Sequence, residues 1–127
     1  MHGGLELVLR IGRFSSQLET AHRNHGVSCS AFITAWNPYS QLTDAATNTT
    51  KQRALAKDLE QEGLTMFPGI GIHPSNQWPG EESFFVLGLT LNAAKQLGIA
   101  FQQNAIVWAG ADAIPQLIML PDTRRPV

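Results

Sequence analysis

Alternating and recurring apolar positions divide the chain into segments of strand and helix. From residue 5 to 11, leucine or isoleucine occupies every odd position, which is the period of a strand with one buried face. Ser16 stands three residues before Glu19, the spacing of a capping box, and Gly26 suits the left-handed residue that follows a helix. The sequence therefore predicts a first strand and then a helix over about residues 16–25.

A run that is apolar on both faces follows this helix and predicts a strand at the centre of a sheet. It covers residues 31–36 and stops at an Asn-Pro dipeptide, because the residue before a proline is pushed out of the helical region. Asn48 or Thr49 then has the residue type that begins a helix, and Gly63 has the type that follows one. We expect a second helix between these positions.

The second half of the chain continues this alternation of strands and helices. Thr90 can begin a third helix that reaches about Gln102. Pro115 fits an edge strand or the start of a strand, because it cannot donate to a ladder. The expected strands in this half are 64–67, 83–89, 105–108 and 116–120, with a long loop over 68–80.

The predicted order of elements is β-α-β-α-β-β-α-β-β. Because an apolar helix face must pack on a sheet, this order predicts an α+β fold, a two-layer sandwich with a mixed β-sheet covered by about three helices. We expect a single domain over residues 1–120. Residues 121–127, which are polar or proline-rich, are expected to form a flexible tail.

Composition and charge restrict the classes of partner. With 127 residues, 43% hydrophobic and 15% charged, the chain can bury one core without metal or disulfide bonds. The formal net charge of -1 provides no broad positive field, so nucleic acid and anionic membranes are not expected partners. The one cysteine cannot form an internal disulfide, and no apolar run fits a membrane span or a signal peptide. We expect a soluble, cytoplasmic protein.

Polar side chains gather where the predicted elements end, which is where α/β proteins tend to place binding groups. Thr34, Trp36 and Asn37 stand at the end of the central strand. Asn48 and Lys51 share a stripe at the start of the second helix, where free N–H groups and partial positive charge could hold an anionic or carbonyl group.

Two later segments add polar candidates, each with a plainer alternative. Glu81 precedes a strand and could point into a pocket, although Glu81 and Glu82 also fit a solvated pair of charges. Gln103 and Asn104 end the third helix, where their amides could read a base edge or a sugar hydroxyl, or cap the helix. The candidate ligand-binding residues are Thr34, Trp36, Asn37, Asn48, Lys51, Glu81, Gln103 and Asn104.

Motifs for metals, nucleotides and catalysis are incomplete. His22, His25 and Cys29 lack a fourth ligand and do not match zinc-finger spacing, so we interpret them as structural residues. Residues 68–72 contain two glycines but satisfy neither the dinucleotide fingerprint nor the Walker loop. His73 is the one histidine that suits acid–base chemistry. We predict no cofactor and no metal, assign no catalytic residue, and leave open whether the protein is an enzyme.

Several short segments resemble those of one bacterial family. They are Phe-Ile-Thr-Ala-Trp-Asn-Pro at 32–38, Asn48 followed by Leu55, Leu59 and Gly63, then Trp78, Glu81 and residues 83–88, and Phe-x-Gln-Asn-Ala at 101–105. On these residues the chain resembles the family catalogued as domain of unknown function 3293, DUF3293, from about Leu7 to Leu120. The resemblance implies no activity, substrate or cofactor.

Two functions fit these observations. The first is a binding domain for a small polar ligand, nucleotide- or sugar-like, because the candidate site is rich in amides and short of nucleophiles. The second is an interaction module without a small ligand, in which Trp36, Tyr39 and Trp78 contact a protein partner. A concave pocket that encloses the polar residues favours the first function, and their dispersal over the surface favours the second.

Overall fold

The structure, a computed structural model, describes residues 7–72 and 80–121. Within these ranges it contains three α-helices and one five-stranded sheet, whose strands lie in the order β2-β3-β1-β4-β5. The elements in chain order are α1 (Ser16–Asn24), β1 (Ser30–Ile33), the short 3-10 helix η1 (Pro38–Ser40), α2 (Ala45–Gln61), β2 (Thr65–Gly71), β3 (Glu81–Leu87), α3 (Leu91–Ala100), β4 (Ala105–Ala109) and β5 (Gln116–Met119).

The expected α+β class is confirmed, and the elements from the first helix onward follow the expected order. The four strand pairings in the described sheet are antiparallel, whereas the sequence suggested a mixed sheet. The reason lies in the two helical connections. The connection through α2 joins β1 to β2 across the intervening β3, and the connection through α3 joins β3 to β4 across β1. The strands that each helix joins are therefore separated by one antiparallel neighbour.

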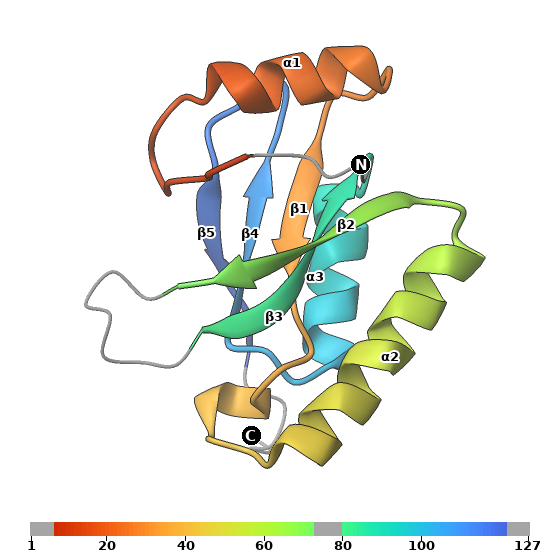
Figure 1. The fold of residues 1–127 in the computed structure, drawn as a ribbon. Helices are drawn as coiled ribbons and strands as arrows, with labels where there is room; N and C mark the ends of the chain where they lie inside the picture. Colours follow the sequence, from red (N-terminus) through yellow and green to blue (C-terminus); the bar gives the residue numbers. More distant parts are fainter. Residues whose placement is uncertain (1–6, 73–79, 122–127) are drawn as a thin grey trace.

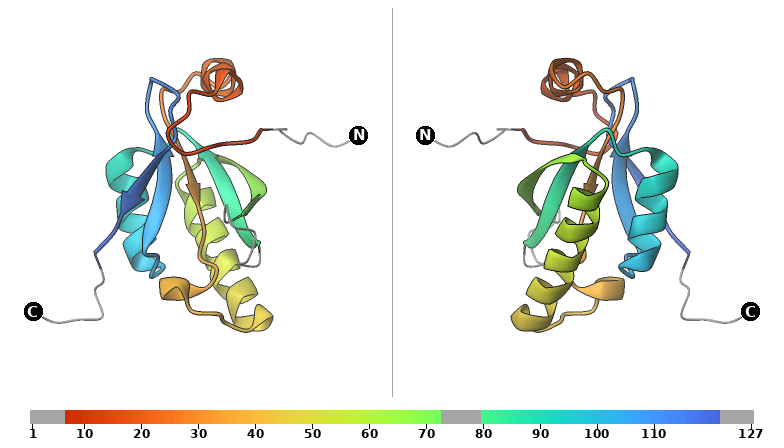
Figure 2. Two further views of the ribbon diagram at one scale, coloured as in Figure 1. Left: turned by 90° about the vertical axis from the view of Figure 1, so that its left-hand side faces the viewer. Right: turned by 90° about the vertical axis from the view of Figure 1, so that its right-hand side faces the viewer.

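The helices are distributed unequally over the two faces of the sheet. Helices α2 and α3 lie side by side on one face, and α1 lies across one end of the other face (Figures 1 and 2). The main core therefore lies between the sheet and the α2–α3 pair, and a smaller apolar cluster lies under α1.

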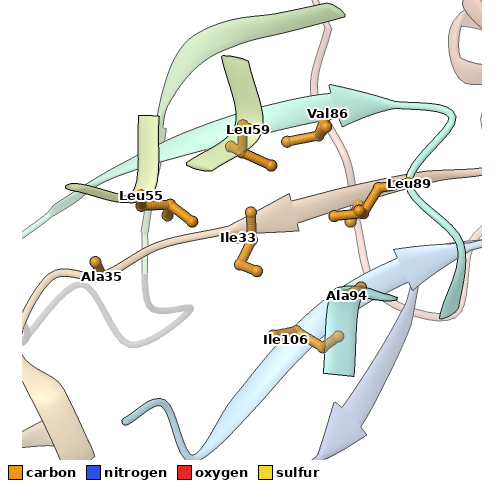
Figure 3. Packing of buried hydrophobic residues seen from close by; sticks show 9 residues of the cluster. Ile33, Ala35, Leu55, Leu59, Val86, Leu89, Ala94 and Ile106 are labelled. Carbon is orange, nitrogen blue, oxygen red and sulfur yellow. The ribbon is translucent and has the colours of Figure 1, made fainter. Parts of the chain in front are cut away.

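Alternate residues of the strands supply the main core. Ile33 of β1 and Ile106 of β4 point toward the helices, where they meet Leu55 and Leu59 of α2 and Ala94 of α3 (Figure 3). Leu55 and Leu59 are fully buried. Burial of such a leucine side chain stabilises the fold by about 1.5–3 kcal/mol, so this stripe of α2 fixes the helix on the sheet.

Helix α3 approaches the sheet closely at Gly98. A Cβ atom at this position would lie 2.4 Å from Leu120 Cδ1 and 2.8 Å from Ile106 Cγ2. Gly98 lies inside the helix, where glycine is less favourable than alanine by about 1 kcal/mol. The glycine therefore permits a helix–strand contact that a side chain would prevent.

Each of the three α-helices begins at a side-chain cap. Ser15 caps α1 by accepting from the Leu18 N–H at 3.0 Å, one residue before the expected position. Thr90 caps α3 as predicted. Asp44 caps α2 by accepting from the Thr47 N–H at 2.9 Å, and the Thr47 hydrogen bonds hold the pKa of the Asp44 carboxyl below its usual value. The helix therefore begins before the expected cap at Asn48, which lies inside it.

The described part of the expected first strand, residues 7–11, has no strand partner. Leu7 and Leu9 instead pack against the cluster under α1, and Val8 between them is 66% exposed. The alternating pattern therefore reflects a segment with one buried side, and this segment is not a strand of the sheet. The segment is anchored after its end by Gly12, whose N–H donates to the Pro115 carbonyl at 2.7 Å.

The remaining expectations concern the segment between β2 and β3 and the C-terminal part of the chain. Strand β2 continues to Gly71, because it pairs with β3 along its whole length, so the expected loop over 68–80 begins too early. The hairpin of β4 and β5 is confirmed, and Pro115 immediately precedes the edge strand β5. His73, Trp78 and residues 122–127 of the expected tail lie outside the described residues. Among the described helices, none is long and apolar enough to cross a membrane.

Candidate functional site

A groove lies on the sheet face opposite α2 and α3. Helix α1 packs on one end of this face, near Leu87 and Ala109. Toward the other end the face carries the short residues Gly71, Ser83 and Ala105, which line the groove. The volume of the groove is about 710 Å³. Short side chains on neighbouring strands, together with the absence of a covering helix among the described elements, leave this part of the sheet hollow.

Apolar side chains form the floor of the groove. Phe32 of β1 stands opposite Val107 of β4, which stands opposite Leu117 of β5. Phe32 also lines a neighbouring hollow of about 330 Å³ on the same face. Its ring lies against the backbone of β2, because a Cβ atom at Gly69 would be 2.9 Å from Phe32 Cε1. The glycine therefore makes room for the ring in the floor.

One end of the groove is polar. At this end the chain leaves β1, enters β3 and turns after α3. The polar side chains that line the groove are Thr34, Ser40, Glu81, Ser83, Gln103 and Asn104. Glu81 is the one charged residue among the described residues of the lining.

Asn37 and Asn48 form a buried pair behind this polar end. Asn48 Oδ1 accepts from the Asn37 backbone N–H at 2.8 Å, and Asn48 Nδ2 donates to Asn37 Oδ1 at 2.9 Å and to the Thr43 carbonyl at 3.1 Å. Asn37 Oδ1 also accepts from the Thr43 N–H at 3.0 Å. Asn37 Nδ2 donates to Glu81 Oε2 at 3.0 Å, so the pair is connected to a carboxylate of the groove.

Thr34 and Gln52 satisfy the backbone where β1 ends. The Thr34 hydroxyl donates to the Glu82 carbonyl at 2.6 Å and accepts from the Trp36 N–H at 2.9 Å. Gln52 Oε1 accepts from the Ala35 N–H at 2.9 Å, while the buried Gln52 Nε2 has no hydrogen-bond partner among the described atoms. These bonds tie α2 and β3 to the segment that leaves β1.

The amides after α3 hold the same segment from the other side. Gln103 Nε2 donates to the Trp36 carbonyl at 3.2 Å and to the Phe101 carbonyl at 3.2 Å. Asn104 Nδ2 donates to Ser40 Oγ at 2.8 Å. Because Trp36 and Ser40 flank the Asn-Pro turn, Gln103 and Asn104 join that turn to the end of α3.

The backbone at this polar end contains several residues in the left-handed region, which side chains other than glycine rarely adopt. The φ angles are 46° at Asn37, 54° at Tyr39, 59° at Ser40 and 61° at Gln102. The Tyr39 N–H donates to the Gln102 carbonyl at 2.6 Å, so these residues lie in one place. Such conformations cost free energy and cluster at functional sites more often than elsewhere.

The structure brings most of the predicted site residues into one region. Thr34, Glu81, Gln103 and Asn104 line the groove. Asn37 and Asn48 lie behind it, with exposed fractions of only 3% and 2%. Trp36 takes part through its backbone, because its N–H and carbonyl bond to Thr34 and Gln103. Lys51 is half-buried on α2 and is not among the residues that line the groove.

Sequence reasoning missed part of the lining. Ser40 and Ser83 add hydroxyl groups, and Phe32, Leu117 and Met119 add apolar surface. Alternation along the strands was the available signal, since positions 81, 83 and 85 share one face of β3. That alternation does not reveal the order of the strands in the sheet, and the order determines which residues lie side by side.

A buried histidine lies away from the groove. His22 Nε2 is 2.7 Å from Ser30 Oγ beneath α1, and burial lowers the pKa of His22. Burial likewise raises the pKa of the Cys29 thiol, which donates to the Leu89 carbonyl. In the described parts of the chain, no group of three or more His, Cys, Asp or Glu side chains could hold a metal ion. The hydrogen bonds of His22 and Cys29 agree with the interpretation of these two side chains as structural.

Comparison with known proteins places the chain in a family. Residues 33–106, more than half of the chain, match the family described as "Protein of unknown function (DUF3293)". This range contains all six of the polar residues that line the end of the groove. Searches of curated proteins and of solved structures found no match. The matched range extends from the end of β1 through α3 to β4, and on this basis the chain belongs to the DUF3293 family.

Proposed function

We propose that this domain binds a small polar ligand, nucleotide- or sugar-like in its hydrogen-bonding groups, in the groove on the open face of the sheet. The observation that carries the proposal is the meeting of six polar side chains at one end of a single groove. Its volume of about 710 Å³ is within the range of roughly 300–1,000 Å³ found for small-molecule sites.

The strained backbone supports the same location. Asn37, Tyr39, Ser40 and Gln102 all have positive φ angles, and they lie where the polar residues meet. The hydrogen bonds of Asn48 and Gln103 hold this conformation. A scaffold that fixes several unfavourable conformations at one place is typical of a preorganised binding site.

Two parts of the groove would contact different parts of such a ligand. Ser40 Oγ accepts from Asn104 Nδ2 and can donate its own hydrogen, whereas Ser83 Oγ donates to the Glu81 carbonyl at 3.1 Å and can accept. Together with the amide of Asn104, these groups suit hydroxyl, amide or ring-nitrogen groups of a ligand. The apolar floor around Phe32 and Val107 suits a ring system that packs on it. The ligand would therefore have a polar and an apolar part.

A protein-binding role is the second candidate, and one observation favours it. Ile72, Leu117 and Met119 line the groove with exposed fractions of 68%, 50% and 67%. Exposed apolar side chains that gather on one face often mark a protein interface. Leu117→Asp should abolish capture of a protein partner if this face is an interface, and should leave small-ligand binding at the polar end largely intact.

A thermal-shift screen with a groove-filling variant tests the proposal. The panel consists of nucleosides, nucleotides and monosaccharides. Ala105→Phe places a ring in the groove, whereas Ala100→Phe places the same ring at an exposed position on α3. We expect at least one compound to raise the melting temperature of the wild type and of Ala100→Phe but not of Ala105→Phe. No shift with any compound, or equal shifts in all three proteins, would contradict the proposal.

A further inference from the structure

We propose that the polar end of the groove selects a ligand group that donates hydrogen bonds, such as the amino group of a heterocycle, and that Gln103 Oε1 accepts from this group. The proposal rests on the proposed function and concerns the hydrogen-bonding character of the same ligand. Its basis is that several side chains at this end already donate their polar hydrogens to backbone carbonyls and retain acceptor atoms.

The side-chain amide of Gln103 is held in one orientation. Its Nε2 donates to the Trp36 carbonyl and to the Phe101 carbonyl, both at 3.2 Å. An amide nitrogen has two hydrogens, so both are bonded. Exchange of the nitrogen and the oxygen would place Oε1 against two carbonyl oxygens, which cannot donate. The position of the Gln103 oxygen is therefore determined by the bonds of its nitrogen.

Gln103 Oε1 is an accessible acceptor without a partner among the described atoms. Gln103 lines the groove although only 7% of its surface is exposed. Among the described residues, Gln52 Nε2 is the one fully enclosed side-chain nitrogen or oxygen atom that lacks a partner, so Gln103 Oε1 retains accessible surface. An acceptor that is already fixed loses little conformational freedom when it binds a donor, which favours its use in recognition.

Two hydroxyl groups of the lining are oriented in the same way. The Thr34 hydroxyl donates to the Glu82 carbonyl at 2.6 Å, and the Ser83 hydroxyl donates to the Glu81 carbonyl at 3.1 Å. A hydroxyl has one hydrogen and two acceptor sites, and Thr34 uses one of these sites for the Trp36 N–H. What these hydroxyl groups can still offer to a ligand is therefore an acceptor.

Ser40 and Asn104 differ, because the bond between them can form in either direction. Asn104 Nδ2 is 2.8 Å from Ser40 Oγ. A hydroxyl can accept from an amide nitrogen or donate to an amide oxygen, so this pair can adapt to a donor or to an acceptor of the ligand. Gln103, which cannot adapt, therefore sets the preference for a donor.

The apolar floor indicates what the donor is attached to. Phe32 and Val107 suit a flat ring that packs on them. A sugar hydroxyl donates and accepts equally well, whereas an amino group on a heteroaromatic ring is mainly a donor. The chemical class that fits both the floor and Gln103 is a nitrogen heterocycle with an amino group, such as an aminopurine or aminopyrimidine nucleoside.

Two pairs of nucleosides that differ in one amino group test this inference. The first pair is adenosine and purine riboside, and the second is cytidine and zebularine, which is cytidine without its amino group. Isothermal titration of each into the wild-type protein gives four dissociation constants. We expect at least one amino nucleoside to bind about tenfold more tightly than its analogue, because the analogue leaves a mostly buried acceptor unpaired. The absence of a preference in both pairs, or no binding of either amino nucleoside at millimolar concentration, would overturn the inference.

The Gln103→Met variant assigns the preference to one side chain, and Gln52→Met is its matched control. Gln52 is 6% exposed and also bonds to the segment that leaves β1, through the Ala35 N–H, but it is not among the described residues that line the groove. Both variants should lose stability. We expect the preference for the amino nucleoside to fall to about twofold or less in Gln103→Met and to persist in Gln52→Met. An unchanged preference in Gln103→Met, or an equal loss in Gln52→Met, would overturn the inference.

A measurement on the wild type decides the matter if Gln103→Met does not fold. The oxygen and nitrogen of an amide are polarised together, so a donor at Gln103 Oε1 should shift the NMR signals of the Nε2 hydrogens. We expect these signals to move with the amino nucleoside that binds and to move much less with its analogue. Unmoved signals in the presence of bound amino nucleoside would contradict the assignment of Gln103 as the acceptor.

These outcomes are distinguishable from failure of the proposed function. If an amino nucleoside and its analogue bind equally and Ala105→Phe abolishes the binding of both, the groove is a ligand site and the inference about donors is wrong. If an amino nucleoside binds with the expected preference but Ala105→Phe has no effect, the ligand lies elsewhere, and both the inference and the location of the site fail.

Discussion

The Asn37–Asn48 pair makes a quantitative prediction about what holds the polar end of the groove. Asn48→Ala removes three hydrogen bonds, to the Asn37 N–H, to Asn37 Oδ1 and to the Thr43 carbonyl. At about 1 kcal/mol for each bond, the free energy of unfolding should fall by about 3 kcal/mol. Asn37→Ala also removes three bonds, one of them shared with Asn48, and places alanine at a φ of 46°. We therefore expect a loss of about 3–4 kcal/mol.

The double variant separates a shared network from two independent caps. The bond between Asn48 Nδ2 and Asn37 Oδ1 is lost in either single variant, so it is counted twice when their effects are added. The double variant should therefore be more stable than additivity predicts by about 1 kcal/mol.

Urea titration of the wild type, both single variants and the double variant measures these free energies. A fixed concentration of sulfate, which strengthens apolar burial, keeps the least stable protein folded. Arg53→Ala, at an exposed position of α2, should change stability by no more than about 0.5 kcal/mol and serves as the control. A loss below about 1 kcal/mol for Asn48→Ala, or strict additivity, would refute the account of the pair as a buried network.

Three further predictions concern the scaffold. Gly98→Ala should destabilise the protein by about 1–2 kcal/mol in thermal unfolding, because the overlap with Ile106 and Leu120 exceeds the gain in helix propensity. A stabilised variant would show that α3 can move away from the sheet at no cost. Leu55→Ala should cost about 2–5 kcal/mol in urea titration, because the leucine is fully buried, and a loss below about 1 kcal/mol would place it outside the core. Burial lowers the pKa of His22 in the folded state, so the unfolded chain binds a proton more readily and stability should fall as the pH decreases through about 6.5. His22→Gln should reduce this dependence of stability on pH, and an unchanged dependence would show that other groups cause it.

The start of a helix or strand was predicted correctly where a single residue type indicates it. Thr90 begins α3 as its side chain indicates, and Pro115 precedes an edge strand. The same rules misplaced the start of α2, because Asp44 competes with Asn48 as a cap and the sequence pattern did not decide between them. The alternating apolar residues from 7 to 11 indicate that one side of this segment is buried. A strand and an unpaired segment that packs on the sheet both have this pattern, so the pattern alone does not distinguish them.

Only part of the candidate site could be predicted, because sequence patterns describe neighbouring residues and the site joins distant segments. Polar residues at the ends of elements, such as Thr34 and Gln103, were found from their positions alone, and both line the groove. The burial of Asn37 could not be derived, because it depends on α2 and β3 meeting the end of β1. The hollow itself depends on register, which places Gly71 beside Glu81 on one face of the sheet. Such contacts between distant segments are not contained in local periodicity.

The most direct test of the central claim is to map where a ligand binds by NMR. The compound is the one that gives the largest thermal shift in the screen, and it is titrated into the uniformly labelled wild-type protein. We expect the largest changes in amide chemical shift at Phe32, Ser83, Gln103 and Val107, which line the groove, and small changes at Lys57 and Lys95 on the exposed sides of α2 and α3. Changes concentrated on α2 and α3, with the groove resonances unmoved, would show that the open face of the sheet is not the ligand site.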